Sequence, residues 1–113
     1  MTHVKFILED GSPVGYVAEG HSGAGTRGND VVCAAVSTLL QALELGMLEV
    51  LKVDGPKYEV DPRVPMRMMI WGRLEGEGPR VLLDTVRISL QSLASAHPSH
   101  IAISEVERRE LRF

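Results

Sequence analysis

The sequence is poor in the residues that would place it in several common protein classes. One cysteine in 113 residues excludes an internal disulfide and favours a reducing compartment. Aromatic residues make up only 4% of the chain. The formal net charge is −3 and the arginines are interleaved with acids, so direct nucleic-acid binding is not expected. We find neither a signal peptide nor a stretch suited to span a bilayer, and we therefore expect a cytoplasmic protein with no membrane partner.

What the chain does contain is the composition of an ordinary globular protein, with 44% hydrophobic and 24% charged residues. We expect a single domain over residues 1–113, built on one hydrophobic core. Segments 3–9 and 14–20 are short and rich in β-branched or aromatic residues, and the turn sequence DGSP lies between them. This pattern predicts a β-hairpin at the start of the chain.

The spacing of apolar residues predicts the remaining elements. In order, these are a helix that begins at Asp30 and stops at Gly46, a strand over 47–53, a turn-rich stretch over 54–65 with room for a short edge strand, a strand over 66–74, a helix over 81–97 and a terminal strand over 100–111. The order β-β-α-β-β-α-β indicates an α+β fold, with a mixed sheet of about four to five strands and two helices packed on one face.

The stretch GHSGAGTRGNDVVCAAVS, residues 20–37, carries the most chemical information. Gly23, Gly25 and Gly28 spell G-x-G-x-x-G between a strand and a helix, and Asp54 ends the next strand as a ribose-binding acid would. A nucleotide-binding domain is therefore one hypothesis. Against it, a hairpin precedes the glycines, the third glycine falls two residues before the predicted helix, and no Walker A lysine follows.

The same stretch also suits a reactive thiol. If Asn29 or Asp30 caps the helix, Cys33 lies in its first turn, where unpaired amides and the helix dipole stabilise a thiolate. The helical spacing places Cys33 at the border of the core, on a flank shared with Asp30 and Ser37. His21 lies just before the glycines and is the candidate base and acid.

The glycine-rich loop has a function in that hypothesis too. Its backbone amides, or those of the first helical turn, are suited to form an oxyanion hole, and its flexibility allows substrate gating. The residues concerned are Gly20, Gly23, Gly25 and Gly28.

Each of these residues also has a plainer explanation. A single cysteine on an amphipathic helix is usually a packing residue, and Asp30 is a natural N-cap. No metal site is indicated, because His3, His97 and His100 show no ligand spacing with Cys33. The absence of a C-x-x-C motif argues against thioredoxin-like chemistry.

Taken as a set, GHSG followed by GNDVVCAAVS resembles the signature of a bacterial family of ribosomal-processing cysteine proteases, Prp. The segments LLDTVRISLQSLASAHP and HIAISEVE are similar to the C-terminal half of that family, so the resemblance covers nearly the whole chain. It implies a cytoplasmic, homodimeric endopeptidase without metal or organic cofactor. Its substrate would be the precursor of large-subunit ribosomal protein number twenty-seven, cleaved beside aromatic residues to remove a short N-terminal extension.

The resemblance also implies roles for individual residues. Cys33 would be the nucleophile and His21 the general base, while Asp30 would orient or cap the site and Ser37 would support it one helical turn beyond Cys33. The loop SGAGTRGN departs from the family pattern because it lacks an aromatic residue. Two alternatives stay open: a non-catalytic ribosome-assembly or peptide-binding module, and the nucleotide-binding domain described above.

Overall fold

A computed structural model of the protein describes residues 1–20, 27–54, 57–61 and 66–111. The elements, in order, are β1 (Thr2–Glu9), β2 (Ser12–Gly20), α1 (Arg27–Leu45), a π-helical turn η1 (Gly46–Val50), β3 (Lys57–Asp61), β4 (Met66–Ile70), α2 (Glu77–Ala96), β5 (Ile101–Glu107) and a 3-10 turn η2 (Arg108–Glu110). This sequence of helices and strands confirms the predicted order β-β-α-β-β-α-β.

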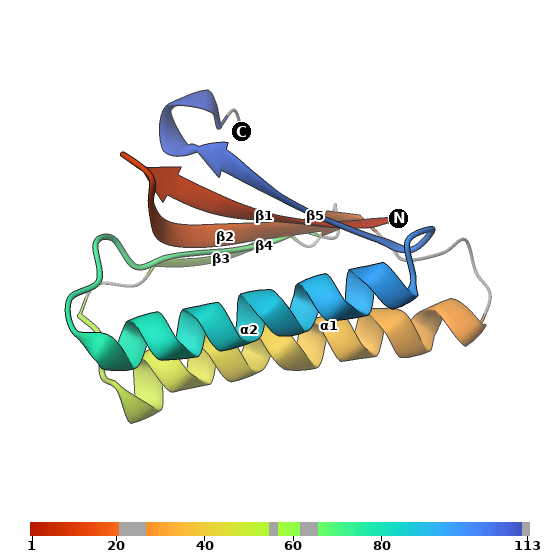
Figure 1. Cartoon of the computed structure of the whole chain (residues 1–113), viewed down its shortest axis with the longest axis horizontal. Coiled ribbons are helices and arrows are strands. Elements are labelled where there is room, and N and C mark those ends of the chain that lie inside the picture. Colours follow the sequence, from red (N-terminus) through yellow and green to blue (C-terminus); the bar gives the residue numbers. More distant parts are fainter. Residues whose placement is uncertain (21–26, 55–56, 62–65, 112–113) are drawn as a thin grey trace.

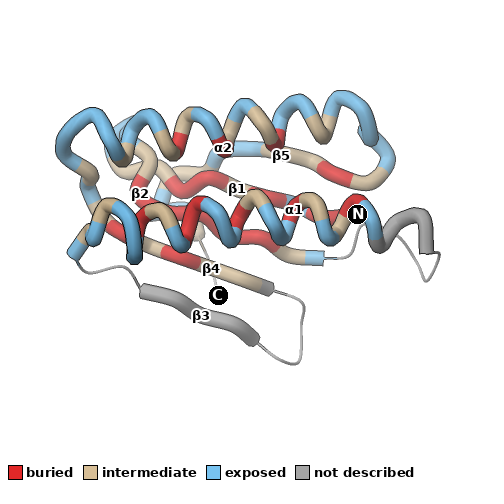
Figure 2. The backbone as a smooth tube through the Cα atoms, turned by 90° about the horizontal axis from the view of Figure 1, so that it is seen from below, coloured by how far each residue is buried: buried red, intermediate tan, exposed pale blue. Residues whose placement is uncertain are grey.

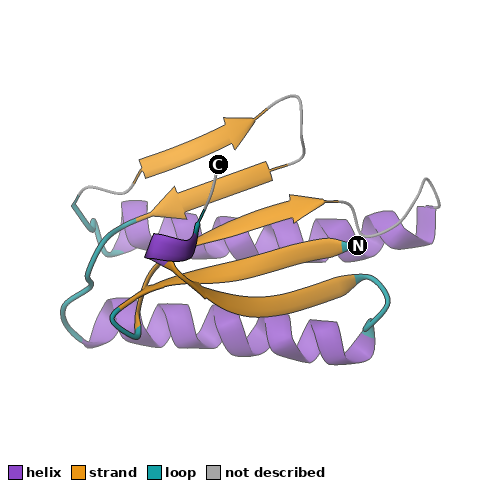
Figure 3. Cartoon of the chain, turned by 90° about the horizontal axis from the view of Figure 1, so that it is seen from above, coloured by secondary structure: helices purple, strands orange, loops and turns teal. Residues whose placement is uncertain are grey.

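The strands form one mixed sheet. Its five strands lie in the order β3-β4-β2-β1-β5, and β5 runs parallel to β1 while the other neighbours are antiparallel. Both helices lie side by side on the same face of the sheet and run in opposite directions (Figures 1 and 3). The predicted α+β architecture is therefore confirmed.

The hairpin between β1 and β2 forms because of its two-residue turn. Asp10 and Gly11 have φ values of 52° and 79°, and Glu9 pairs directly with Ser12 across them. Positive φ at both central residues characterises the turns whose twist matches that of paired strands, and aspartate followed by glycine adopts it readily. The turn sets the register at this end of the hairpin, and a bulge between Ile7 and Leu8 shifts it for the rest of the two strands.

The core lies between the sheet and the helix pair, and Figure 2 shows buried positions, in red, on both of these layers. Alternation along the strands directs every second side chain towards the helices, and the 3.6-residue period of α1 supplies a matching stripe. The buried residues of this core are Val4, Phe6, Tyr16, Ala18, Val32, Val36, Leu40, Leu43, Met47, Met69, Trp71, Leu83, Val86, Leu90 and Ile101.

The strand predicted over 47–53 does not exist, because helical structure continues into η1. Met47 lies four residues after Leu43 and extends the same buried stripe, with no exposed surface. The amide of Leu51 donates to the carbonyl of Gly46 at 2.8 Å, which closes a π-type turn. The third strand is instead β3, at the sheet edge, inside the stretch where a short edge strand was expected.

The α-helix itself ends at Leu45, immediately before Gly46, in agreement with the prediction, but a π-helical turn continues the helical structure from Gly46. A Cβ at this position would overlap a methyl group of Leu82 on α2. The glycine leaves room for the end of the Leu82 side chain beside the backbone where α1 passes into η1. Two helix starts were also placed too late: α1 begins at Arg27, not Asp30, and α2 begins at Glu77, not 81.

The expectation that no stretch of the chain is suited to span a bilayer needs correction. Val31–Val50 is long and apolar enough to cross a membrane by length and composition, with a mean hydropathy of 1.8. In the structure this segment is α1 and its extension, and Val36, Leu40 and Leu43 are buried in the core. A core helix passes the same test of length and composition. Packing on the sheet accounts for those residues, whereas Val31, Leu45, Leu48 and Val50 are exposed.

Candidate functional site

Cys33 lies on α1 at the border of the core, as the helical spacing predicts, and is half-buried. The expectation that Asn29 or Asp30 caps the helix is wrong, since α1 begins at Arg27. Cys33 is the seventh residue of α1 and belongs to its second turn. The amide donors and positive dipole of a helix end fade beyond the first turn, so they do not account for an activated thiol at this position.

The structure brings one side chain to the thiol that sequence reasoning missed. Oγ1 of Thr2, at the start of β1, lies 3.9 Å from Sγ of Cys33. Thr2 is buried, and its amide donates to the carbonyl of His100 at 2.8 Å. Its alternation with Val4 was the available signal, because every second residue of β1 faces the helices.

The sheet register places Gly20, the residue before His21, beside Thr2. Thr2 pairs with Gly20 on one side and with Ile101 on the other. Gly20 is the last residue of β2, and the next residue along the chain is His21. The strand end that leads into the candidate base is thus paired with the strand that contacts Cys33.

The other candidate residues are distributed over α1 and the preceding segment. Asp30 and Gly28 belong to the first turn of α1, so Gly28 is not two residues before a helix as expected. Ser37 is exposed on α1, one helical turn beyond Cys33. The remaining candidates lie outside the described residues: His21, Gly23 and Gly25.

Because Gly28 lies in α1, one objection to a nucleotide site no longer holds. The sheet topology still argues against such a site. The glycine motif follows β2, and β2 is antiparallel to both of its neighbours, β1 and β4. The motif of dinucleotide-binding folds follows a strand of a parallel sheet, where the loop opens at a strand-order switch. The described part of the chain also holds no cluster of three or more potential metal ligands.

Gly20 is required where it stands. Its φ is +88°, and a Cβ there would overlap the carbonyl oxygen of Met1. We expect Gly20→Ala to lower the free energy of unfolding by about 2–4 kcal/mol, from left-handed strain plus steric overlap. Gly72→Ala is the matched control, because Gly72 has a φ of +82° and open space where a methyl group would lie. Equal urea midpoints for the two variants would show that the close approach of Met1 to Gly20 does not matter for stability.

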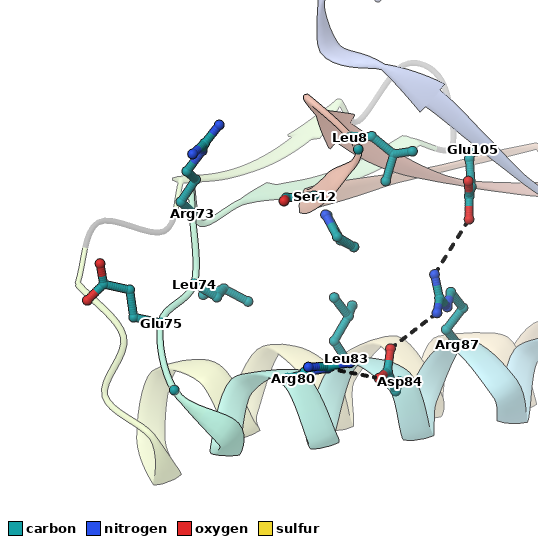
Figure 4. A pocket seen from close by; sticks show the side chains of 13 residues that line it. Leu8, Ser12, Arg73, Leu74, Glu75, Arg80, Leu83, Asp84, Arg87 and Glu105 are labelled. Atoms are coloured by element: carbon teal, nitrogen blue, oxygen red, sulfur yellow. Dashed lines mark hydrogen bonds and ion pairs between the residues drawn. The ribbon is translucent and has the colours of Figure 1, made fainter.

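A polar pocket of about 690 Å³ opens between the β1–β2 turn and the first half of α2 (Figure 4). Arg87 bridges Asp84 at 3.2 Å and Glu105 at 3.5 Å across its wall. Because the helices are antiparallel, the first half of α2 lies beside the last half of α1, away from the second turn that carries Cys33. This pocket is therefore separate from the thiol site.

A cluster of three polar side chains around a buried carboxylate connects α1, β2 and β4. Glu44 accepts a hydrogen bond from the hydroxyl of Tyr16, and its Oε1 and Oε2 lie 2.8 and 2.9 Å from Arg67 Nε and Nη2. Glu44 is 6% exposed. Sequence reasoning missed this cluster, although a carboxylate inside an apolar helix stripe is a signal for a buried partner.

Comparisons with known proteins agree with one another. A family model described as cysteine protease Prp matches residues 1–102. The ribosomal processing cysteine protease Prp of Mycoplasma genitalium is 25% identical over 89 residues, which cover 79% of this chain and 85% of that protein.

Solved structures share the fold. SMU.848 from Streptococcus mutans gives a TM-score of 0.79 at 26% identity, over 96% of each chain. The essential ribosomal processing protease Prp from Staphylococcus aureus gives 0.78 at 20% identity, over 94% of this chain and 100% of that one. It was solved with a substrate peptide and with a covalently linked product peptide.

Proposed function

Since the chain belongs to the Prp family of cysteine proteases, we propose that Cys33 is its nucleophile. One observation carries this assignment: a cysteine protease needs a cysteine, and Cys33 is the only one in the chain. Its position supports the assignment, because the residue is only half-buried and its sulfur contacts the Thr2 hydroxyl at the start of β1.

The reaction is an acyl transfer through the sulfur. Cys33 gives its proton to a base, and the thiolate attacks the scissile carbonyl carbon, forming a C–S bond. The C–N bond breaks, the amine fragment takes a proton from the protonated base and leaves, and a thioester remains. Water then adds to the thioester carbon and gives a proton to the base, the C–S bond breaks, and the protonated base returns its proton to the sulfur as the carboxylic acid fragment leaves.

The supporting roles follow from the family pattern at matching positions. We assign the base to His21, an orienting role to Asp30 and a supporting role to Ser37. The loop glycines supply oxyanion donors or allow the loop to move for substrate. These are Gly20, Gly23, Gly25 and Gly28. No metal or organic cofactor enters this mechanism.

The proposed substrate is the precursor of large-subunit ribosomal protein number twenty-seven, from which a short N-terminal extension is removed. The Mycoplasma genitalium relative is named a ribosomal processing protease, and the Staphylococcus aureus protease was solved with peptides. We further propose that residues 1–113 act as one domain, in the cytoplasm and as a homodimer.

The test is mass spectrometry of a synthetic peptide spanning the N-terminal junction of the host ribosomal protein. We expect the protein to cut one bond, and we expect prior treatment with iodoacetamide to prevent the cut. Because the chain has one cysteine, alkylation reports on Cys33 alone. An untreated protein that binds the peptide without cutting it would favour a peptide-binding module instead.

A further inference from the structure

The start of β1 places a buried hydroxyl against the sulfur of Cys33. Thr2 is 6% exposed, and its Oγ1 lies 3.9 Å from Sγ. Buried polar groups in proteins are generally hydrogen-bonded, and the sulfur is the partner that the structure gives this hydroxyl. The two residues are 31 positions apart in the sequence, so the fold alone creates the contact.

The hydroxyl is held in a fixed position by backbone on both sides. Thr2 pairs with Gly20 in β2 and with Ile101 in β5, and its amide donates to the carbonyl of His100. A β-branched side chain has few χ1 rotamers, so a fixed backbone largely fixes Oγ1 as well. The hydroxyl is therefore organised before any substrate binds.

Either atom of this contact can donate while the sulfur is a thiol, but only the hydroxyl can donate once the sulfur is ionised. A threonine hydroxyl can donate or accept, whereas a thiolate has no proton and can only accept. A hydrogen bond to the ionised form of a group stabilises that form, and such charge-assisted bonds are shorter and stronger than neutral ones. A donor beside Sγ therefore lowers the free energy of the thiolate relative to the thiol.

We propose that Thr2 is a positioning residue for Cys33, whose hydroxyl donates a hydrogen bond to the thiolate and holds Sγ beside the end of β2. This inference rests on the proposed function, in which Cys33 is the nucleophile. Thr2 acts through the sulfur and forms no bond with substrate.

Other titratable groups share this end of the molecule. The α-amino group of Met1 precedes Thr2, and the half-buried His100 follows α2. His97 stacks on His100, with ring centroids 6.4 Å apart. His21 comes directly after β2 in the sequence. All of these groups are the same in wild type and Thr2 variants, so a comparison between variants isolates the hydroxyl.

The experiment measures the rate of alkylation of Cys33 by iodoacetamide from acid to alkaline pH, and kcat/KM for the junction peptide at pH 7. Thr2→Val replaces the hydroxyl by a methyl group and keeps the β-branch, while Thr2→Ser keeps the hydroxyl. Thr38→Val is the matched control on α1, because the exposed Thr38 hydroxyl bonds the carbonyl of Ala34 at 2.8 Å. Thermal unfolding establishes that each variant is folded.

For Thr2→Val we expect a pH profile displaced to higher pH, with alkylation and kcat/KM at pH 7 about three- to tenfold lower. Thr2→Ser and Thr38→Val should follow the wild type. A folded Thr2→Val protein with the wild-type profile would overturn the inference, and so would equal losses in Thr2→Val and Thr2→Ser. Persistent peptide cleavage by Cys33→Ala would instead overturn the proposed function, while the alkylation profiles would still decide the role of the hydroxyl.

Discussion

Cys33→Ala is expected to abolish peptide cleavage while the protein stays folded. Removal of a covalent nucleophile removes the acyl-enzyme route, and we expect kcat/KM to fall by about 10³-fold or more. The change deletes one sulfur at a half-buried position and removes the partner of the buried Thr2 hydroxyl, so the free energy of unfolding should fall by about 1–2 kcal/mol. Cleavage followed by mass spectrometry and unfolding in urea measure the two effects separately.

The control for this result is Thr38→Val, which alters an exposed residue on the same helix and should cut at the wild-type rate. Cys33→Ser provides a second comparison, because a hydroxyl of nearly the same size has a far higher pKa than a thiol and is a poor nucleophile without strong activation. If Cys33→Ala cleaved the peptide as fast as wild type, the nucleophile would have to be another group.

Glu44→Ala is expected to be among the most destabilising single changes in the protein. It removes the acceptor shared by Tyr16 and Arg67, so the half-buried guanidinium loses this ion pair. Breaking one side of a buried ion pair is costly, but the Arg67 side chain keeps 29% exposure and so retains some hydration. We expect a loss of about 2–4 kcal/mol in the free energy of unfolding.

Two further variants separate charge from hydrogen bonding in this cluster. Tyr16→Phe removes only the hydroxyl and should cost about 1 kcal/mol. Glu44→Gln keeps the side-chain shape and an acceptor but removes the charge, so its cost should lie between the other two. Urea unfolding of all three measures the series. A Glu44→Ala protein as stable as wild type would show that the cluster contributes nothing to stability.

The order of elements could be predicted from the sequence because its signals are local. The turn at Asp10 and Gly11 and the spacing of apolar residues on the helices need only neighbours in the chain to be read. The third strand was misplaced because a short apolar run does not distinguish a strand from a buried helical extension. Met47 packs on the core as the next step of the α1 stripe, and this tertiary contact decides the outcome.

The candidate site also combines a feature that could be predicted from the sequence with contacts that could not. The half-buried flank position of Cys33 follows from the helical period, which the sequence displays directly. The contact with Thr2 does not, because it depends on which strand lies over the start of α1. The ion-pair partner of Glu44 could not be predicted for the same reason, since Arg67 is 23 residues away and belongs to another layer.

The parallel pairing of β1 with β5 has a consequence for the order of events during synthesis. β1 is synthesised before every other described strand, yet one of its two edges stays unpaired until Ile101 and the residues after it have been added. Contacts between distant parts of a chain carry the largest loop-closure cost and form late in folding. β5 completes the backbone that surrounds Thr2. The surroundings of the thiol therefore form only after β5 has been synthesised. A nascent chain that ends before β5 lacks them.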